Sequence, residues 1–395
     1  MRYAAITDRL LDLGGAKWEL HALAKAKLAA GIPVIMLTIG APDVATPPAL
    51  IAEAKRAMDA GRLGYSDGRG EPGLLAALAA RYAARTGRPI STAQIACLPG
   101  TQTALYAVLL ALTGPGDEVL VGDPMYATYE GVIAASGAKT VPVPLRPEHG
   151  FRMQVADVAA RITPRSRVLF LNTPHNPTGA VLRADDLAAL GALAIKHDLW
   201  IISDEVYEEL VFDSARFISP FDDAALADRV VVTSSISKSH AAPGFRSGWC
   251  VGSEEFSVRL LPVVETMLFG NQPFIADMTQ LAVSAPSTVA SGMALRFARR
   301  AALIHTLLDG RQGLRAHRPE AGMFTVLDIR ATGLSGEEFA RGLLETEQVA
   351  VMPGESFGVS LRGWVRISLT LDDDLVATAC SRILAFSARL QGIAA

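Results

Sequence analysis

Short apolar segments alternate with helical ones through the middle of the chain, and this alternation constrains the fold more than any other feature. Strands are predicted at residues 118–122, 140–143, 168–172, 200–203, 230–233 and 248–251. Several segments between them are helical, such as 184–197, whose Leu187, Leu190 and Ala194 share one face. Short apolar strands connected by helices predict an α/β fold with a mostly parallel sheet covered on both faces. Such sheets bind ligands beyond the carboxyl ends of their strands.

The two ends of the chain follow a different pattern, in which helices and apolar segments no longer alternate regularly. Helices are predicted at 17–30 and 291–308, and two more are predicted to begin at Thr46, as N-cap, and at Ser335. A strand is predicted at 34–39, and further apolar segments lie at 323–329 and 364–369. We therefore expect a large domain at 46–288 and a smaller α+β domain that both chain ends, 1–45 and 289–395, form together.

Composition excludes several classes of protein. The chain has 395 residues, of which 50% are hydrophobic and 19% charged, as expected for a globular protein. A formal net charge of −3 offers no electrostatic basis for binding nucleic acid or an anionic membrane. The three cysteines lack metal-ligand spacing and are odd in number, so we expect no metal site and a reducing compartment. With no apolar signal segment at the start and no run of roughly 20 apolar residues, a cytoplasmic protein is expected.

One lysine follows a predicted strand in a loop of small residues. Lys238 comes shortly after 230–233, and Arg246 follows eight positions later. A lysine whose pKa is lowered by burial or by neighbouring charge becomes a nucleophile that condenses with aldehydes. Arg246 and the hydroxyls of Ser235 and Ser237 are suited to binding a phosphate. The alternative is a solvated loop with incidental charges.

Two more predicted strands end in polar residues. Asn176 lies in the segment 172–179, whose two prolines and glycine hold the backbone so that its amide can face a ligand. Asp204 follows the apolar residues 200–202 and is expected to be partly desolvated, with a cationic partner, while Tyr207 follows three residues later. The alternative for the Asn176 segment is a plain Asn-Pro turn, and the alternative for Asp204 is a helix N-cap.

A helix start and a tyrosine complete the set of strand-end candidates. The small residues Gly100, Thr101 and Gln102 open an apolar helix, and free N–H groups at such a start suit a phosphate. Tyr126 follows the strand 118–122 and is a candidate for stacking on a flat ring, although core packing is the more common role of a tyrosine.

Two further motif matches lack their context. Residues 68–73 fit the glycine pattern of dinucleotide-binding loops, but no predicted strand precedes them. Ser235 and Lys238 fit the SxxK pattern of serine acyl hydrolases, whose partner motifs SDN and KTG are absent from the sequence.

Taken together, these residues resemble the class I aminotransferases, pyridoxal-phosphate enzymes of fold type I. The shared motifs are, in chain order, Gly40-Ala41-Pro42-Asp43, Tyr65, Asn176-Pro177-Thr178-Gly179, Asp204 with Tyr207, Ser235-x-x-Lys238 with Arg246, and Val365-Arg366-Ile367-Ser368. Within this family the chain is most similar to bacterial arginine–pyruvate transaminases, through its first three residues, the segment around Trp18 and the segment 237–240. The resemblance implies a seven-stranded, mostly parallel sheet in the large domain and a homodimer.

The resemblance also implies roles around the cofactor, pyridoxal 5'-phosphate. Lys238 would bind it as a Schiff base and carry the proton during the reaction, and Asp204 would keep its ring nitrogen protonated. Tyr207 and Asn176 would hydrogen-bond its phenolic oxygen, and Tyr126 would stack on its ring. The phosphate would be held by Gly100, Thr101, Gln102, Ser235 and Arg246, and by Tyr65 from the neighbouring subunit.

For the substrate, the resemblance implies that Arg366 binds the α-carboxylate, together with Asn176 and the backbone of Gly40. The expected reaction is ping-pong transamination between an L-amino acid and a 2-oxo acid such as pyruvate. Residues 265–268 contain no arginine for a second carboxylate, so arginine or another basic or broad donor is favoured, with Glu19 or Asp67 as candidate partners of a guanidinium. The alternatives are a β-lyase acting on cysteine conjugates, an aspartate- or aromatic-type aminotransferase, and a ligand sensor, which would need an additional DNA-binding module.

Overall fold

The computed structural model describes residues 1–11, 13, 15–212 and 215–393. The helices are α1 (Ala5–Leu10), α2 (Glu19–Ala29), α3 (Pro48–Asp59), α4 (Pro72–Thr86), α5 (Thr101–Leu112), α6 (Tyr129–Ser136), α7 (Val155–Ala159), α8 (Ala184–Lys196), α9 (Ile236–Ser239), α10 (Glu254–Met267), α11 (Pro273–Val283), α12 (Thr288–Leu308), α13 (Gly336–Glu347) and α14 (Asp373–Ile393). The strands are β1 (Ile35–Met36), β2 (Ile95–Leu98), β3 (Glu118–Asp123), β4 (Lys139–Pro144), β5 (Ser166–Asn172), β6 (Trp200–Asp204), β7 (Val230–Ser235), β8 (Gly248–Val251), β9 (Arg315–Ala316), β10 (Phe324–Asp328), β11 (Val349–Ala350), β12 (Met352–Pro353) and β13 (Trp364–Ser368).

Seven strands form the central sheet, in the order β2-β8-β7-β6-β5-β3-β4. Neighbours from β7 to β4 run parallel, whereas β8 is antiparallel to both β7 and β2. The predicted α/β fold with a mostly parallel sheet is therefore confirmed. All six predicted sheet strands are present, and most extend one or two residues beyond the predicted ends.

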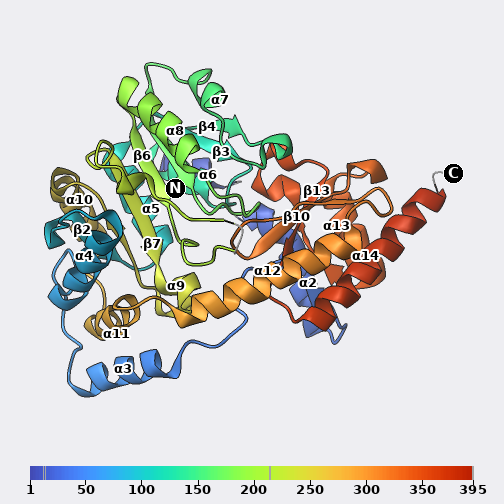
Figure 1. The fold of residues 1–395 in the computed structure, drawn as a ribbon, viewed down its shortest axis with the longest axis horizontal. Coiled ribbons are helices and arrows are strands. Elements are labelled where there is room, and N and C mark those ends of the chain that lie inside the picture. The colour runs from blue at the N-terminus through green and yellow to red at the C-terminus, as the bar shows by residue number, and fades with distance from the viewer. Residues whose placement is uncertain (12, 14, 213–214, 394–395) are drawn as a thin grey trace.

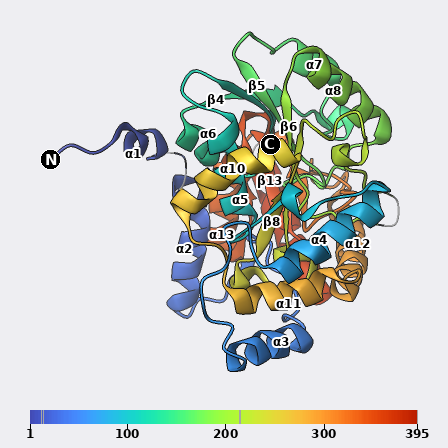
Figure 2. The same cartoon turned by 90° about the vertical axis from the view of Figure 1, so that its left-hand side faces the viewer.

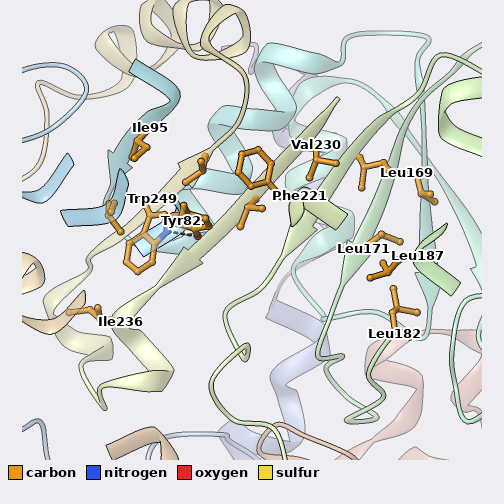
Figure 3. Packing of buried hydrophobic residues seen from close by; sticks show 14 of the residues in the cluster. Tyr82, Ile95, Leu169, Leu171, Leu182, Leu187, Phe221, Val230, Ile236 and Trp249 are labelled. Atoms are coloured by element: carbon orange, nitrogen blue, oxygen red, sulfur yellow. Dashed lines mark hydrogen bonds between the residues drawn. The ribbon is translucent and has the colours of Figure 1, made fainter. Parts of the chain in front are cut away.

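Helices cover both faces of this sheet, as the predicted pattern requires (Figure 1). Along β5, Val168 and Phe170 pack with residues of α5, α6 and α10, whereas Leu169 and Leu171 pack with residues of α4, α8 and α11. Because successive side chains of a strand point to opposite faces, an apolar run buries one cluster on each side. In the second cluster the indole of Trp249 donates a hydrogen bond of 2.9 Å to the hydroxyl of Tyr82 (Figure 3).

The C-terminal part contains a four-stranded antiparallel sheet, in the order β12-β13-β10-β9. Residues of α2, α12, α13 and α14 share a hydrophobic cluster with it, and β1 pairs with β11, so α2 and β1 of the N-terminal part join the C-terminal part here (Figure 1). In contrast, α1 lies apart from this cluster (Figure 2). It contacts α6 instead, where the carbonyl of Ala134 accepts a hydrogen bond of 3.2 Å from the Arg9 side chain. The division into 46–288 and the two chain ends stays a prediction.

Two local predictions were wrong, and a third, the strand at 34–39, was right in place but too long. The strand predicted at 34–39 pairs only at Ile35 and Met36, and the carbonyl of Thr38 is instead bound by Arg366. Pro47 rather than Thr46 is the N-cap of α3, because the Thr46 hydroxyl donates to the carbonyl of Ala241. The segment around Lys238 is one turn of helix, α9, rather than a loop.

No helix in the described part of the chain is long and apolar enough to cross a membrane.

Candidate active site

A cavity of about 240 Å³ lies at the carboxyl ends of β5, β6 and β7. Residues separated widely in sequence share its wall because parallel strands present their ends at one edge of the sheet. The lining residues are Trp18, Ile39, Gly40, Thr101, Gln102, Leu105, Tyr126, Tyr129, Asn172, Asn176, Asp204, Val206, Tyr207, Ser235, Ser237, Lys238, Pro243, Arg246, Phe324 and Arg366.

Lys238 enters this cavity from α9. The hydroxyl of Ser235 accepts the N–H of Ser237 and so caps the single helical turn that carries the lysine. The Nζ atom of Lys238 donates a hydrogen bond of 2.7 Å to the carbonyl of Gly40. Burial, and then the charges of Arg366 and Arg246, lower the pKa of Lys238 to about 8. About a tenth of this amine is therefore neutral and nucleophilic at pH 7, and about half of it at pH 8.

Asp204 is a buried carboxylate at the end of β6. The Tyr129 hydroxyl donates a hydrogen bond of 2.7 Å to its Oδ2, and the N–H of Val206 donates one of 3.2 Å to its Oδ1. Burial raises the pKa of Asp204 to about 6 despite these two bonds, which lower it. The carboxylate lines the cavity without a cationic partner among the described residues, so a positively charged group in the cavity would stabilise its ionised form.

A chain of hydrogen bonds connects Tyr207, Asn176 and Arg366. The Asn176 amide donates to the Tyr207 hydroxyl at 3.4 Å, and its oxygen accepts from Nη1 of Arg366 at 3.2 Å. Asn172 holds this asparagine in place, since its side-chain oxygen accepts the Asn176 N–H at 2.8 Å. Three polar side chains thus keep a fixed arrangement along one wall of the cavity.

Two aromatic rings enclose the guanidinium of Arg366. Its central carbon lies 3.8 Å from the ring centre of Phe324 and 4.3 Å from that of Phe357. Phe324 in turn packs on Gly40, where a Cβ atom would come within 2.2 Å of its ring. Burial lowers the pKa of Arg366 to about 9, so the group stays charged at neutral pH. Its Nε is buried without a hydrogen-bond partner among the described residues.

The opposite end of the cavity combines a helix start with an arginine. Gly100 precedes α5 with a φ of 84°, and a Cβ atom there would come within 2.2 Å of the Arg246 guanidinium. Arg246 is held by the carbonyl of Pro243 at 2.9 Å, and the buried Thr101 hydroxyl has no partner among the described residues. The free N–H groups of α5, this hydroxyl and Arg246 form a cradle for an anion.

Comparison with known proteins identifies the family. A family profile for "Aminotransferase class I and II" matches residues 32–383. The chain belongs to the class I and II aminotransferases. This aminotransferase is 43% identical to the arginine–pyruvate transaminase AruH of Pseudomonas aeruginosa, over 99% of this chain and 100% of that protein. It is 34% identical to an aspartate/prephenate aminotransferase of Cereibacter sphaeroides, over 93% and 94% of the two chains. The aspartate aminotransferase of Thermus thermophilus solved with maleate superposes with a TM-score of 0.92 at 28% identity, over 98% and 100%.

Enzymes of this family depend on pyridoxal 5'-phosphate, and the cavity of this aminotransferase fits that cofactor. The cradle at Gly100 and Arg246 leaves an unpartnered hydroxyl for a phosphate, Asp204 is an anion without a cation, and Lys238 is an amine of lowered pKa. Each of these features is unfavourable in an empty protein interior and complements one part of the cofactor.

The predicted site residues divide into those the structure brings together and those it does not. Lining the cavity are Gly40, Thr101, Gln102, Tyr126, Asn176, Asp204, Tyr207, Ser235, Lys238, Arg246 and Arg366, while Gly100 lies behind Arg246. Tyr65 does not line it: the side chain is 91% exposed and packs edge-on against Phe269, 5.9 Å between ring centres. Glu19, which pairs with Arg341, and the exposed Asp67 also lie outside it.

Sequence reasoning assigned no role to Tyr129, Phe324 or Phe357. A tyrosine six residues after Asp123 carries no local signal, because its partner Asp204 lies 75 residues further along the chain. Phe324 and Phe357 occupy apolar positions that a strand and a buried turn would use in any case.

Proposed function

We propose that this aminotransferase transfers the α-amino group of arginine, or of another basic L-amino acid, to a 2-oxo acid such as pyruvate. The observation that carries the proposal is the number of arginines in the cavity lining. The lining contains two arginines, Arg246 in the cradle at α5 and Arg366 in the aromatic enclosure. With one needed for the cofactor phosphate and one for the α-carboxylate, the described part of this lining has no third arginine for the second carboxylate of aspartate or glutamate. The relation to an arginine–pyruvate transaminase supports the same donor.

We assign the cofactor contacts to residues already described. Lys238 would hold it covalently, Asp204 would pair with its ring nitrogen, Tyr207 and Asn176 would bind its phenolic oxygen, and Tyr126 would lie against its ring. Gly100, Thr101, Gln102, Ser235 and Arg246 would hold its phosphate. When bound, pyridoxal phosphate supplies an aldehyde and an electron-withdrawing ring that accepts the electrons of a broken Cα–H bond.

The protein's own groups bind the substrate and move the proton. Arg366, whose plane is fixed by two rings and by Asn176, would bind the α-carboxylate, assisted by the backbone of Gly40. Lys238, once its amine is free, would remove the proton from the substrate Cα and return it to the neighbouring carbon of the cofactor. Its lowered pKa suits this role because a neutral amine accepts a proton and an ammonium donates one at nearly the same pH.

The donor assignment is tested by single half-reactions. Wild-type protein loaded with cofactor is mixed with each common L-amino acid, without a 2-oxo acid, and conversion to the amino form is followed by absorbance. We expect arginine to react with a higher kcat/KM than aspartate and glutamate. A preference for a dicarboxylic donor, or release of pyruvate from cystathionine without a 2-oxo acid, would contradict the proposal. Borohydride reduction and peptide mapping should find the cofactor on Lys238 and no adduct in Lys238→Ala.

A homodimer is part of the proposal. Tyr65 and Phe269 are 91% and 75% exposed, so an aromatic pair lies on the surface of the single chain. Burial of this pair in a partner would bring Tyr65 to the phosphate of the neighbouring site. Mixing Tyr65→Phe subunits with Lys238→Ala subunits should restore activity, because a mixed dimer then contains one intact site. No gain over the separate variants would disprove the shared site.

We also propose a cytoplasmic location. The three cysteines are free and buried, as in proteins of reducing compartments. Recovery of the protein in a periplasmic or secreted fraction would rule this out.

A further inference from the structure

We infer that Trp18 determines the preference for a cationic substrate side chain by presenting its indole face to the guanidinium. The inference rests on the proposed donor and adds the group that recognises it. The cavity supplies no carboxylate for this purpose: among the described residues of its lining the acidic side chain is Asp204, which is assigned to the ring nitrogen of the cofactor. Glu19 and Asp67 lie outside the cavity. The face of an aromatic ring attracts a cation that has no carboxylate partner, and tryptophan is the strongest such ring.

Among the aromatic side chains of the lining, the other four are engaged. Arg366 covers the face of Phe324, the Tyr129 hydroxyl donates to Asp204, and the Tyr207 hydroxyl accepts from the Asn176 amide. Tyr126 is assigned to the cofactor ring. Trp18 is half-buried, lines the cavity, and has no arginine or lysine over its ring within the described residues.

The neighbouring contacts hold Trp18 against the cavity. Lys17 forms an ion pair with Glu130 of α6, and its ammonium donates to the carbonyl of Ala127 at 3.4 Å. The Ser356 hydroxyl donates to the carbonyl of Lys17 at 3.1 Å. The residue directly before Trp18 is thus tied to two separate segments, so the indole is positioned in advance of binding.

The test compares arginine with citrulline, which has nearly the same shape but an uncharged end. Wild-type protein should prefer arginine in kcat/KM. In Trp18→Leu we expect the arginine-to-citrulline ratio to fall about three- to thirtyfold, with Trp18→Phe in between and citrulline itself little changed. Trp200→Leu, a half-buried tryptophan outside the cavity lining, should leave the ratio unchanged.

A binding measurement independent of turnover uses 5-guanidinopentanoate, an arginine analogue without the α-amino group, and its ureido counterpart. Calorimetry should show that Trp18→Leu weakens binding of the guanidino compound and leaves binding of the ureido compound unchanged. If wild-type protein does not prefer arginine to citrulline, the proposed donor fails and this inference with it. If wild-type protein prefers arginine and Trp18→Leu keeps the full ratio, or loses both substrates equally, the inference alone is overturned.

Discussion

The hydroxyl of Tyr129 lies 2.7 Å from Oδ2 of Asp204, and the two side chains meet on the wall of the cavity although 75 residues separate them. The tyrosine is fully buried, and the centre of its ring lies 4.4 Å from the ring centre of Phe170. Burial and the neighbouring Asp204 raise the pKa of Tyr129 well above its ordinary value, so it remains a hydrogen-bond donor. It is therefore a positioning residue for Asp204.

Tyr129→Phe should weaken cofactor binding. Loss of a hydrogen bond to a charged group costs about 1.5–3 kcal/mol, which corresponds to roughly a tenfold or greater increase in Kd. The pKa of Asp204 should rise further, so the pH at which the absorbance of the bound cofactor changes should shift as well. Titration of cofactor-free protein with pyridoxal phosphate measures the change in Kd. Tyr106→Phe, on α5 outside the cavity lining, is the matched control, and equal effects of both variants would refute the role of Tyr129.

Asp204→Asn should stabilise the cofactor-free protein while weakening cofactor binding. Burial raises the pKa of Asp204 from 3.8 to about 6, so the folded state holds its proton more tightly than the unfolded state. Its contribution to the free energy of unfolding therefore falls as pH rises from about 4 to 6. At pH 8 the variant should gain up to about 3 kcal/mol, and at pH 4 almost nothing. Urea unfolding at both pH values measures this, and an equal gain at both would argue against a buried charge.

Covalent attachment of the cofactor should follow the neutral form of Lys238. With its pKa lowered to about 8, the association rate of pyridoxal phosphate with cofactor-free protein should rise from pH 6 and level off above about pH 9. An unperturbed lysine would continue to gain reactivity beyond pH 10. Stopped-flow absorbance measures the rate, and a profile that still rises at pH 10 would show that burial has not lowered this pKa.

Phe357→Leu should raise the KM for both the amino acid and the 2-oxo acid. This ring lies 4.3 Å from the Arg366 guanidinium, is absent from the cavity lining, and acts by holding the arginine. A desolvated cation–π contact is strong enough for about a three- to tenfold increase, with kcat within about twofold. Phe339→Leu, a buried phenylalanine of the C-terminal cluster, should leave both constants unchanged. A loss confined to kcat would point away from Arg366.

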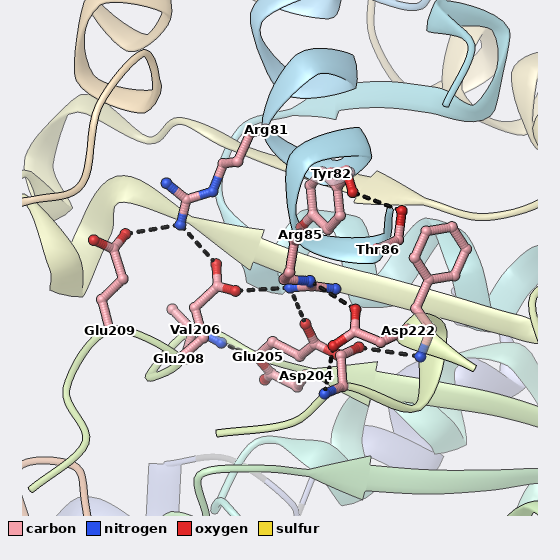
Figure 4. Close-up of polar contacts among 12 residues, drawn as sticks. Arg81, Tyr82, Arg85, Thr86, Asp204, Glu205, Val206, Glu208, Glu209 and Asp222 are labelled. Atoms are coloured by element: carbon pink, nitrogen blue, oxygen red, sulfur yellow. Dashed lines mark hydrogen bonds and ion pairs between the residues drawn. The ribbon is translucent and has the colours of Figure 1, made fainter. Parts of the chain in front are cut away.

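Arg85→Met should unfold the protein at much lower urea concentrations at pH 8. Arg85 contacts Glu205, which is fully buried directly after Asp204, and also Glu208 and Asp222 (Figure 4). Removal of one partner from such a cluster costs about 3–5 kcal/mol because a buried charge is left unpaired.

Burial raises the pKa of Glu205 above its ordinary range, and loss of Arg85 raises it further, so the deficit should shrink as pH falls and Glu205 takes up a proton. The double variant Arg85→Met/Glu205→Gln is the control and should recover part of the loss at pH 8. A deficit that does not change with pH would exclude Glu205 as its source.

Local pattern alone predicted six of the seven strands of the central sheet and the positions of many site residues. Apolar runs with β-branched residues can be buried on both faces only in a covered sheet, and the polar residues that end such runs have to meet at one edge. For that reason Asn176, Asp204 and Lys238 could be named before their distances were known, and they do line one cavity. The motifs also indicated the family that the comparisons establish.

Tertiary structure alone decided which groups surround those residues. Tyr129 against Asp204 and Phe324 against Arg366 are contacts between segments far apart in sequence, and Trp18 reaches the cavity from the N-terminal part of the chain. Thr46 illustrates the same limit, since its hydroxyl bonds to the Ala241 carbonyl instead of capping the next helix. Local propensities are worth about 1 kcal/mol or less per residue, so a hydrogen bond or ring contact of about the same strength, formed on folding, is enough to override them. Partner choice therefore depends on packing, which no short segment of sequence encodes.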